Sequence, residues 1–232
     1  MKKTFVFDAV HTILRPMPDV ISAYFLAGKR HGSAIAKNDV KRRFREGRRK
    51  VFGTSVSAKE TKRGALPSSD HIEFQLWSEL VAHVFEDVHP IGELFQKLWE
   101  HFASPANWQL YDDVDSCFNS IKAAGHQIVV ASNFDTRLLE ILERQPCCQL
   151  IDRVYCSAAV GYRKPDPMFY EVVSRSSGFD DPSSIVMVGD DFQNDYVAPR
   201  MHGWNALHLN RQTSEPSGEY EIADLNSVSG CL

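Results

Sequence analysis

Hydrophobic and polar positions divide the chain into a helical front part and an alternating rear part. Apolar residues recur at helical spacing over four segments, 19–31, 38–51, 70–88 and 90–102. The first strand candidate, 4–7, is short and continuously apolar, which is typical of a strand covered on both faces. Further strands are predicted at 127–131, 184–188 and 206–209, with a weak short strand at 153–156. Amphipathic segments between the later runs predict helices at 112–124, 135–145, 167–177 and 194–202. Repeated β–α units of this length indicate a parallel sheet with helices on both faces.

The helical block interrupts the alternating pattern directly after the first strand. We therefore predict an α/β fold in which residues 1–15 and 105–232 form a Rossmann-like parallel sheet core. Residues 16–104 are predicted to form an inserted all-α cap, with a small and polar loop at 53–69. A short final element is expected around 220–225.

Composition supports a globular chain and argues against a membrane protein. Of the 232 residues, 43% are hydrophobic and 24% are charged, and the apolar runs are far shorter than the ~20 residues that a membrane span needs. The first residues meet a charge before any apolar segment develops, so we expect no export signal. Five cysteines, an odd number with Cys147 and Cys148 adjacent, favour reduced thiols in the cytoplasm.

Charge is distributed unevenly along the chain. Residues 1–64 carry 16 of the 26 Lys and Arg but only 5 of the 30 Asp and Glu. Seven of the ten residues at 41–50 are basic, which is consistent with a lid that attracts an anionic substrate or with a nucleic-acid patch. We favour a solvated helix face with Val40, Phe44 and Val51 packed inward, and we expect no nucleic-acid partner.

Polar residues with metal and phosphate chemistry follow the predicted strands. They are Asp8, Ser132, Asn133, Lys164, Asp190, Asp191 and, in the next helical turn, Asp195. Because the carboxyl ends of parallel strands meet at one edge of a sheet, we expect these side chains to lie together. Clustered carboxylates repel one another unless a cation neutralises them, and oxygen ligands favour Mg²⁺. A lone carboxylate at a turn, Asp8, is suited to act as a nucleophile toward phosphorus.

Four stretches resemble the ordered motifs of the haloacid dehalogenase (HAD) superfamily of hydrolases. They are residues 7–14, 131–135, 163–166 and 188–195, and their spacing is similar to that of members with a helical (C1-type) cap. Residues 132–138 further resemble the rhythmically expressed, haloacid dehalogenase-like hydrolase domain-containing subfamily. The resemblance covers nearly the whole chain, and the cap is its loosest part.

The resemblance implies roles for individual residues. Asp8 would form an aspartyl-phosphate, and Asp8, Asp190 and the backbone carbonyl of Val10 would bind Mg²⁺. Ser132, Asn133 and Lys164 would hold the phosphoryl group, and Asp191 and Asp195 would support the site. For Asp191, capping of the following helix is an equally good interpretation. The implied activity is a Mg²⁺-dependent phosphatase acting on a small phosphorylated metabolite.

One position departs from the phosphatase pattern. Phosphatases of the superfamily carry a second Asp as general acid and base where this chain has Val10. Loss of such a group costs ~10²–10⁴-fold in rate, so slow turnover is expected. His11 stands where Gly is usual and titrates near neutral pH, so it is a candidate replacement, although a tolerated turn residue is the favoured interpretation.

Three alternatives remain open at this stage. Dehalogenases of the superfamily also lack the second Asp, but they do not need the metal-site acids that are present here. Phosphonate-cleaving relatives have a small apolar residue at that position and use a cap lysine, for which Lys41 or Lys50 would be candidates. The third is a catalytically silent phosphate-binding protein. The expected partner is a small anionic substrate, and the expected assembly is a monomer or weak homodimer.

Overall fold

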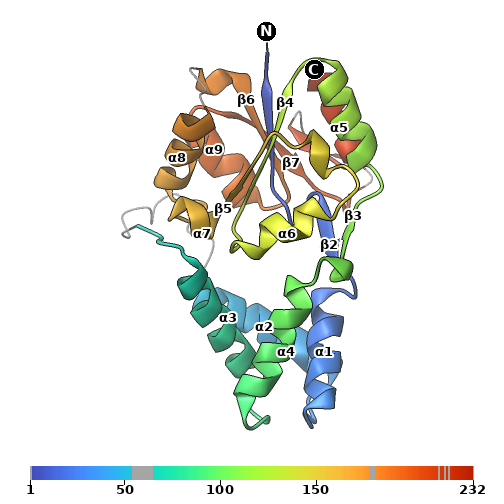
Figure 1. Cartoon of the computed structure of the whole chain (residues 1–232), viewed down its shortest axis with the longest axis vertical. Helices are drawn as coiled ribbons and strands as arrows, with labels where there is room; N and C mark the ends of the chain where they lie inside the picture. Colours follow the sequence, from blue (N-terminus) through green and yellow to red (C-terminus); the bar gives the residue numbers. More distant parts are fainter. Residues whose placement is uncertain are drawn as a thin grey trace.

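A parallel sheet with helices on both faces forms the upper part of the molecule in Figure 1. The computed structural model of the chain describes residues 2–53, 65–177, 181–213, 215–216, 218 and 220–231. Within these residues, six parallel strands lie in the order β5-β4-β1-β6-β7-β8. The strands are β1 (Thr4–Phe7), β4 (Gln127–Ser132), β5 (Arg153–Cys156), β6 (Ile185–Gly189), β7 (Asn205–Leu209) and β8 (Glu221–Ile222). The predicted α/β fold class is confirmed.

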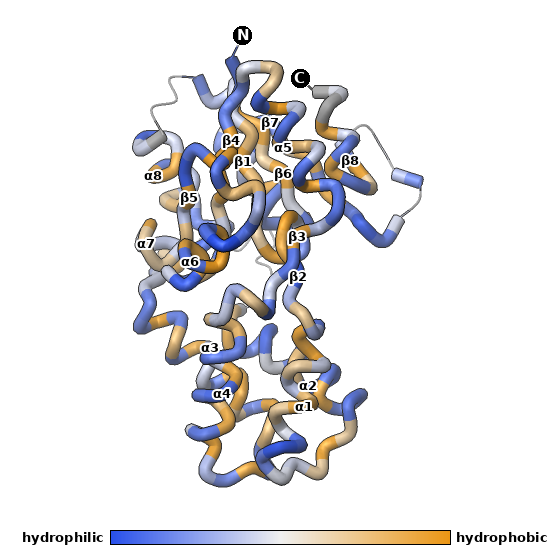
Figure 2. Tube along the Cα trace, turned by 45° about the vertical axis from the view of Figure 1, so that its right-hand side comes forward, coloured by the Kyte–Doolittle hydropathy of each residue, from blue (hydrophilic) through white to orange (hydrophobic). Residues whose placement is uncertain are grey.

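Side chains alternate between the two faces of the sheet and build a separate core on each. Phe5 and Phe7 point to the face covered by α5 (Val114–Ala123) and α6 (Arg137–Glu143). Val6 points to the opposite face, which is covered by α8 (Pro167–Ser177). Both faces of β1 are therefore buried, which explains its continuously apolar sequence (Figure 2).

Several elements differ from the sequence-based prediction. The ribbon of β2 (Leu14–Pro16) and β3 (Trp108–Leu110) and the short helix α7 (Ser157–Val160) were not predicted, because segments of three or four residues carry too little periodicity. The helix expected over 70–88 ends at Val84, since Phe85 leaves helical geometry. The helix expected over 194–202 is a π-helical turn, η4 (Phe192–Val197), followed by α9 (Ala198–Met201).

Helices α1 (Val20–Arg30), α2 (Lys37–Val51), α3 (Asp70–Val84) and α4 (Ile91–Ala103) form the part of the chain that we call the helical segment. It has its own apolar core, in which Tyr24, Val40 and Phe44 are buried. The basic stretch lies on α2, where Arg42 pairs with Asp39 and Glu46 on the exposed side. This placement fits the interpretation of a solvated helix face.

The helical segment lies below the carboxyl ends of the sheet strands (Figure 1). Asp70 accepts hydrogen bonds from the backbone N and Oγ1 of Thr136, at 2.9 and 3.0 Å. Arg137 donates to the carbonyl of Trp99 at 2.9 Å, and its guanidinium lies 3.3 Å from the centre of the Trp99 ring. Polar contacts thus join α3 and α4 to the start of α6.

Within the described residues, every helix is too short or too polar to span a lipid bilayer. Cys117, Cys147, Cys148 and Cys156 carry free thiols.

Candidate active site

Asp8 lies at the centre of the candidate site. It directly follows β1, whose register places Phe7 beside Val130 of β4 and Val188 of β6. Its side chain is 11% exposed, and its Oδ1 atom accepts from Ser132 Oγ at 2.9 Å and from Lys164 Nζ at 2.8 Å. No described residue donates a hydrogen bond to Oδ2. One carboxylate oxygen is therefore held in place while the other is available for chemistry.

Lys164 is a buried cation surrounded by oxygen atoms. Its Nζ donates to Asp8 Oδ1, to the carbonyl of Ala131 at 2.9 Å and to Asp195 Oδ1 at 2.6 Å. Burial by itself lowers the pKa of a lysine, but the negative charges and hydrogen bonds of Asp195 and Asp8 outweigh it and raise the pKa of Lys164. Lys164 therefore remains a full positive charge beside the carboxylate of Asp8.

Asp190 and Asp195 carry the surplus negative charge of the site. Burial and repulsion from Asp8 raise the pKa of Asp190 to about 8, although Lys164 opposes the shift. Burial likewise raises the pKa of Asp195 to about 7, against the attraction of Lys164. Because one ammonium cannot neutralise this group of carboxylates, the site favours binding of a further cation.

Asp195 fits against the end of β6 only because Gly189 has no side chain. A Cβ atom on Gly189 would lie 2.3 Å from Asp195 Oδ2. The same Oδ2 accepts from the backbone N of Asp191 at 3.1 Å. The π-helical turn η4, a geometry that often marks functional sites, therefore directs Asp195 inward toward Lys164.

Asp191 caps this turn. Its Oδ1 accepts from the backbone N atoms of Gln193 and Asn194, both at 3.0 Å. Asn133 has a similar structural contact, because its amide binds both backbone groups of Lys164, at 2.7 and 2.9 Å. Asp191 and Asn133 thus shape the backbone that carries Asp195 and Lys164.

Val10 and His11 form the turn after the nucleophile candidate. Val10 is half-buried against the apolar core, and no described residue donates a hydrogen bond to its carbonyl oxygen. His11 adopts the left-handed conformation, with φ of 66°, and is exposed. Partial desolvation of its ring lowers the pKa of His11, the carboxylate of Asp8 opposes this shift, and the charge of Arg48 adds to it. His11 is therefore neutral near pH 7 and lies within electrostatic range of Asp8.

Thr12 is a site residue that the sequence analysis missed. Its fully buried hydroxyl accepts from the backbone N of Asp190 at 3.2 Å and lies 3.4 Å from Asp190 Oδ1. The only sequence signal was its position within the first motif, because the contact joins positions 178 residues apart.

The free oxygen atoms fit a hard divalent cation. Oxygens of Asp8, Asp190 and Asp195 lie within 4.8 Å of one another. Asp195 already binds Lys164 and the backbone of Asp191, whereas Oδ2 of Asp8, Oδ2 of Asp190 and the carbonyl of Val10 have no donor among the described residues. Two carboxylates and a carbonyl are a donor set that suits Mg²⁺.

Comparison with known proteins identifies the family to which this chain belongs. Residues 2–203 match the sequence profile of the family described as haloacid dehalogenase-like hydrolase. The chain belongs to this family.

Named relatives of this HAD-like hydrolase agree with the expected subfamily. Haloacid dehalogenase-like hydrolase domain-containing protein 3 of Homo sapiens is 26% identical over 214 residues, covering 88% of this chain and 80% of that protein. The protein of the same name from Bos taurus is 30% identical over 139 residues, which span 57% of this chain and 55% of that protein. Rhythmically expressed gene 2 protein of Drosophila melanogaster is 21% identical over 224 residues, covering 91% and 84%.

Solved structures of several HAD-like proteins share the fold. A HAD-hydrolase of Bacillus subtilis bound to magnesium has a TM-score of 0.74 at 17% identity, covering 99% of this chain and 98% of that one. A defluorinating L-2-haloacid dehalogenase has a TM-score of 0.74 at 18% identity, covering 100% and 95%. A HAD phosphatase of Thermococcus onnurineus has a TM-score of 0.62 at 20% identity, covering 100% and 97%. The fold is therefore compatible with both chemistries.

The helical segment of this HAD-like hydrolase contacts the residue before Lys164. Glu73 of α3 is buried, accepts from Ser68 Oγ at 2.7 Å and lies 3.6 Å from the Nε atom of Arg163. The Arg163 guanidinium also lies 4.7 Å from the centre of the Phe52 ring. By contrast, Lys41 and Lys50 are exposed, and their ammonium groups form no hydrogen bond or ion pair with a described residue.

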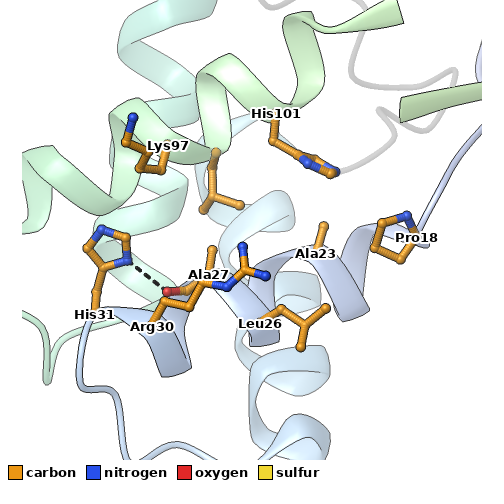
Figure 3. Close-up of a pocket in the computed structure, with 9 residues that line it drawn as sticks. Pro18, Ala23, Leu26, Ala27, Arg30, His31, Lys97 and His101 are labelled. Carbon is orange, nitrogen blue, oxygen red and sulfur yellow. Dashed lines mark hydrogen bonds between the residues drawn. The ribbon is translucent and has the colours of Figure 1, made fainter. Parts of the chain in front are cut away.

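A hollow of about 330 Å³ lies elsewhere, between α1 and α4 (Figure 3). Pro18, Leu26 and His101 contribute to its lining, and His31 on its rim is hydrogen-bonded to the carbonyl of Ala27. None of the site residues predicted from the sequence lines it. It is thus separate from the carboxylate cluster.

Proposed function

We propose that this HAD-like hydrolase is a Mg²⁺-dependent phosphatase that acts on a small phosphorylated metabolite through an aspartyl-phosphate. The observation that carries the proposal is the environment of Asp8. One of its oxygens is fixed by Ser132 and Lys164, and the other belongs to a surplus of carboxylate oxygens that matches a divalent cation.

The residues of the site divide the reaction between them. A carboxylate oxygen of Asp8 forms a bond to phosphorus while the bond from phosphorus to the ester oxygen breaks. Lys164 and Ser132 donate hydrogen bonds to the phosphoryl oxygens, where negative charge develops. Water then attacks the aspartyl-phosphate, which releases phosphate and restores Asp8. The leaving ester oxygen needs a proton that Val10 cannot supply, so we propose slow turnover.

The proposed metal site uses this chain's own oxygen atoms. Asp8, Asp190 and the carbonyl of Val10 would hold Mg²⁺, and Asp195 would keep Lys164 in place. Bound Mg²⁺ supplies Lewis-acid polarisation of the phosphoryl group. Asp191 would support the site by capping the turn that carries Asp195.

We propose that residues 16–104 act as a cap over this site. The position of the helical segment at the carboxyl ends of the strands supports this role (Figure 1). Arg48 of α2 is near enough for its charge to lower the pKa of His11, so the proposed cap brings positive charge toward the site. This positive charge would attract an anionic substrate.

We further propose a cytoplasmic location for the enzyme, because free thiols are typical of proteins in that compartment.

A dehalogenase-type reaction is the second candidate. Val10, which cannot transfer a proton, favours it, and the fold that this chain shares with L-2-haloacid dehalogenases is compatible with it. In that reaction Asp8 would form a carboxylic ester with the substrate carbon while halide leaves. The surplus acids Asp190 and Asp195 favour the phosphatase instead, because without a cation they repel one another.

The proposal is tested by assaying phosphate release from 4-nitrophenyl phosphate with Mg²⁺ and with EDTA. Release that requires Mg²⁺ and disappears in Asp8→Asn is expected, whereas Asp112→Asn, a change at an acid outside the carboxylate cluster, should match the wild type. Halide release from 2-chloropropionate in EDTA would support the second candidate. Absence of both reactions would support a silent phosphate-binding protein.

A further inference from the structure

Arg211 links the C-terminal part of the chain to the candidate metal site. It follows β7 and lies beyond the residues that match the family profile. Its guanidinium forms two hydrogen bonds with the carboxylate of Asp113, at 2.8 and 3.0 Å. The guanidinium also lies 3.9 Å from the centre of the Tyr111 ring. These contacts fix the plane of the guanidinium. The side chain of Arg211 is only 18% exposed.

The same guanidinium holds the turn after the nucleophile candidate. Its Nη2 atom donates to the carbonyl of Thr12 at 2.7 Å. The backbone N of Tyr111 donates to the carbonyl of Ile13 at 3.1 Å, so two consecutive carbonyls of this turn are held from the Tyr111 side. The hydroxyl of Thr12 in turn contacts both the backbone N and Oδ1 of Asp190.

We propose that Arg211, oriented by Asp113, is a positioning residue that fixes Asp190 for metal binding through Thr12. The inference rests on the metal site of the proposed function. Groups that orient metal ligands without touching the metal typically change metal affinity ~10–100-fold when they are removed. Lysine cannot replace Arg211, because a single ammonium does not reproduce the two bonds to Asp113 together with the bond to Thr12.

A purely structural role is the competing explanation. Asp113 Oδ2 also accepts from the backbone N of Leu225 at 2.9 Å, so the ion pair fastens the C-terminal segment to α5. Loss of that fastening would lower stability without changing the metal affinity of the folded protein. Metal affinity therefore separates the two explanations.

The test measures Mn²⁺ binding from the loss of the free-ion EPR signal, with Mg²⁺ as competitor. For Arg211→Lys we expect Mg²⁺ affinity to fall ~10–100-fold, with KM for 4-nitrophenyl phosphate at saturating Mg²⁺ within about twofold of wild type. Arg15→Lys is the matched control, because Arg15 also lies over the Tyr111 ring, at 5.2 Å, but hydrogen-bonds Gln109 instead of Thr12.

Thr12→Val keeps the shape of the side chain and removes the hydroxyl, so it should weaken Mg²⁺ binding even if Arg211→Lys fails to fold. Wild-type Mg²⁺ affinity in folded Arg211→Lys, or in Thr12→Val where the arginine variant does not fold, would overturn the inference. A wild-type protein that binds Mg²⁺ but releases no phosphate would reject the proposed phosphatase and leave this test intact. A wild-type protein that binds neither ion would reject both.

Discussion

The Nζ atom of Lys164 lies 2.6 Å from Oδ1 of Asp195, and both side chains are almost completely buried. The pair joins two segments that follow different strands of the sheet, β5 and β6. Lys164 also has a second carboxylate contact, to Asp8. The charge of Lys164 is therefore needed both for the candidate reaction and for the balance of buried charge.

Removal of the ammonium in Lys164→Met should abolish activity and lower the free energy of unfolding by about 3–5 kcal/mol, because Asp195 would be left as an unpaired buried charge. The double variant Lys164→Met/Asp195→Asn should recover part of the stability and remain inactive. Urea unfolding in EDTA measures both effects. A double variant no more stable than the single one would show that the ion pair is not the cause.

Val10→Asp should raise phosphatase turnover about 10–100-fold, because it places a carboxyl group where the leaving oxygen needs a proton. His11→Gln should change kcat by less than about threefold, since a tolerated turn residue is the favoured interpretation of His11. Both rates are measured with 4-nitrophenyl phosphate and an alkyl phosphate, whose poorer leaving group depends more on the acid. A large loss in His11→Gln would instead identify His11 as the proton donor.

The metal-free protein should lose stability as pH rises from about 5 to about 8. The raised pKa values of Asp190, about 8, and Asp195, about 7, mean that the folded state binds more protons than the unfolded state in this range. Stability then falls with increasing pH, by several kcal/mol in total. Asp190→Asn should flatten the profile in EDTA, and an unchanged slope would argue against repulsion at this carboxylate.

Gly189→Ala should destabilise the protein by about 1–3 kcal/mol and reduce activity, because the added methyl group would overlap the Asp195 carboxylate. Gly92→Ala is the control. A Cβ atom at this helical position in α4 meets nothing within 4 Å, so stability should rise by about 0.5–1 kcal/mol. Thermal unfolding compares the two variants, and equal stability of Gly189→Ala and wild type would contradict the close approach seen here.

The sequence determined the architecture and the edge at which the site lies. Repeated β–α units indicated a parallel sheet, and the carboxyl ends of parallel strands meet at one edge by geometry. For this reason the grouping of Asp8, Ser132 and Asp190 follows from the sequence alone. The helical segment was also evident, because its amphipathic spacing extends over many turns.

Only the tertiary structure decided how these groups are paired. Local sequence does not specify contacts between residues more than a hundred positions apart, such as Arg211 with Thr12 or Thr12 with Asp190. Nor does it show that Asp195 binds Lys164 while Asp191 caps a π-helical turn, since both are acids in one short motif. The hydrophobic pattern sets which faces are buried, but the packing of the folded chain sets which oxygen atoms are left free for a cation.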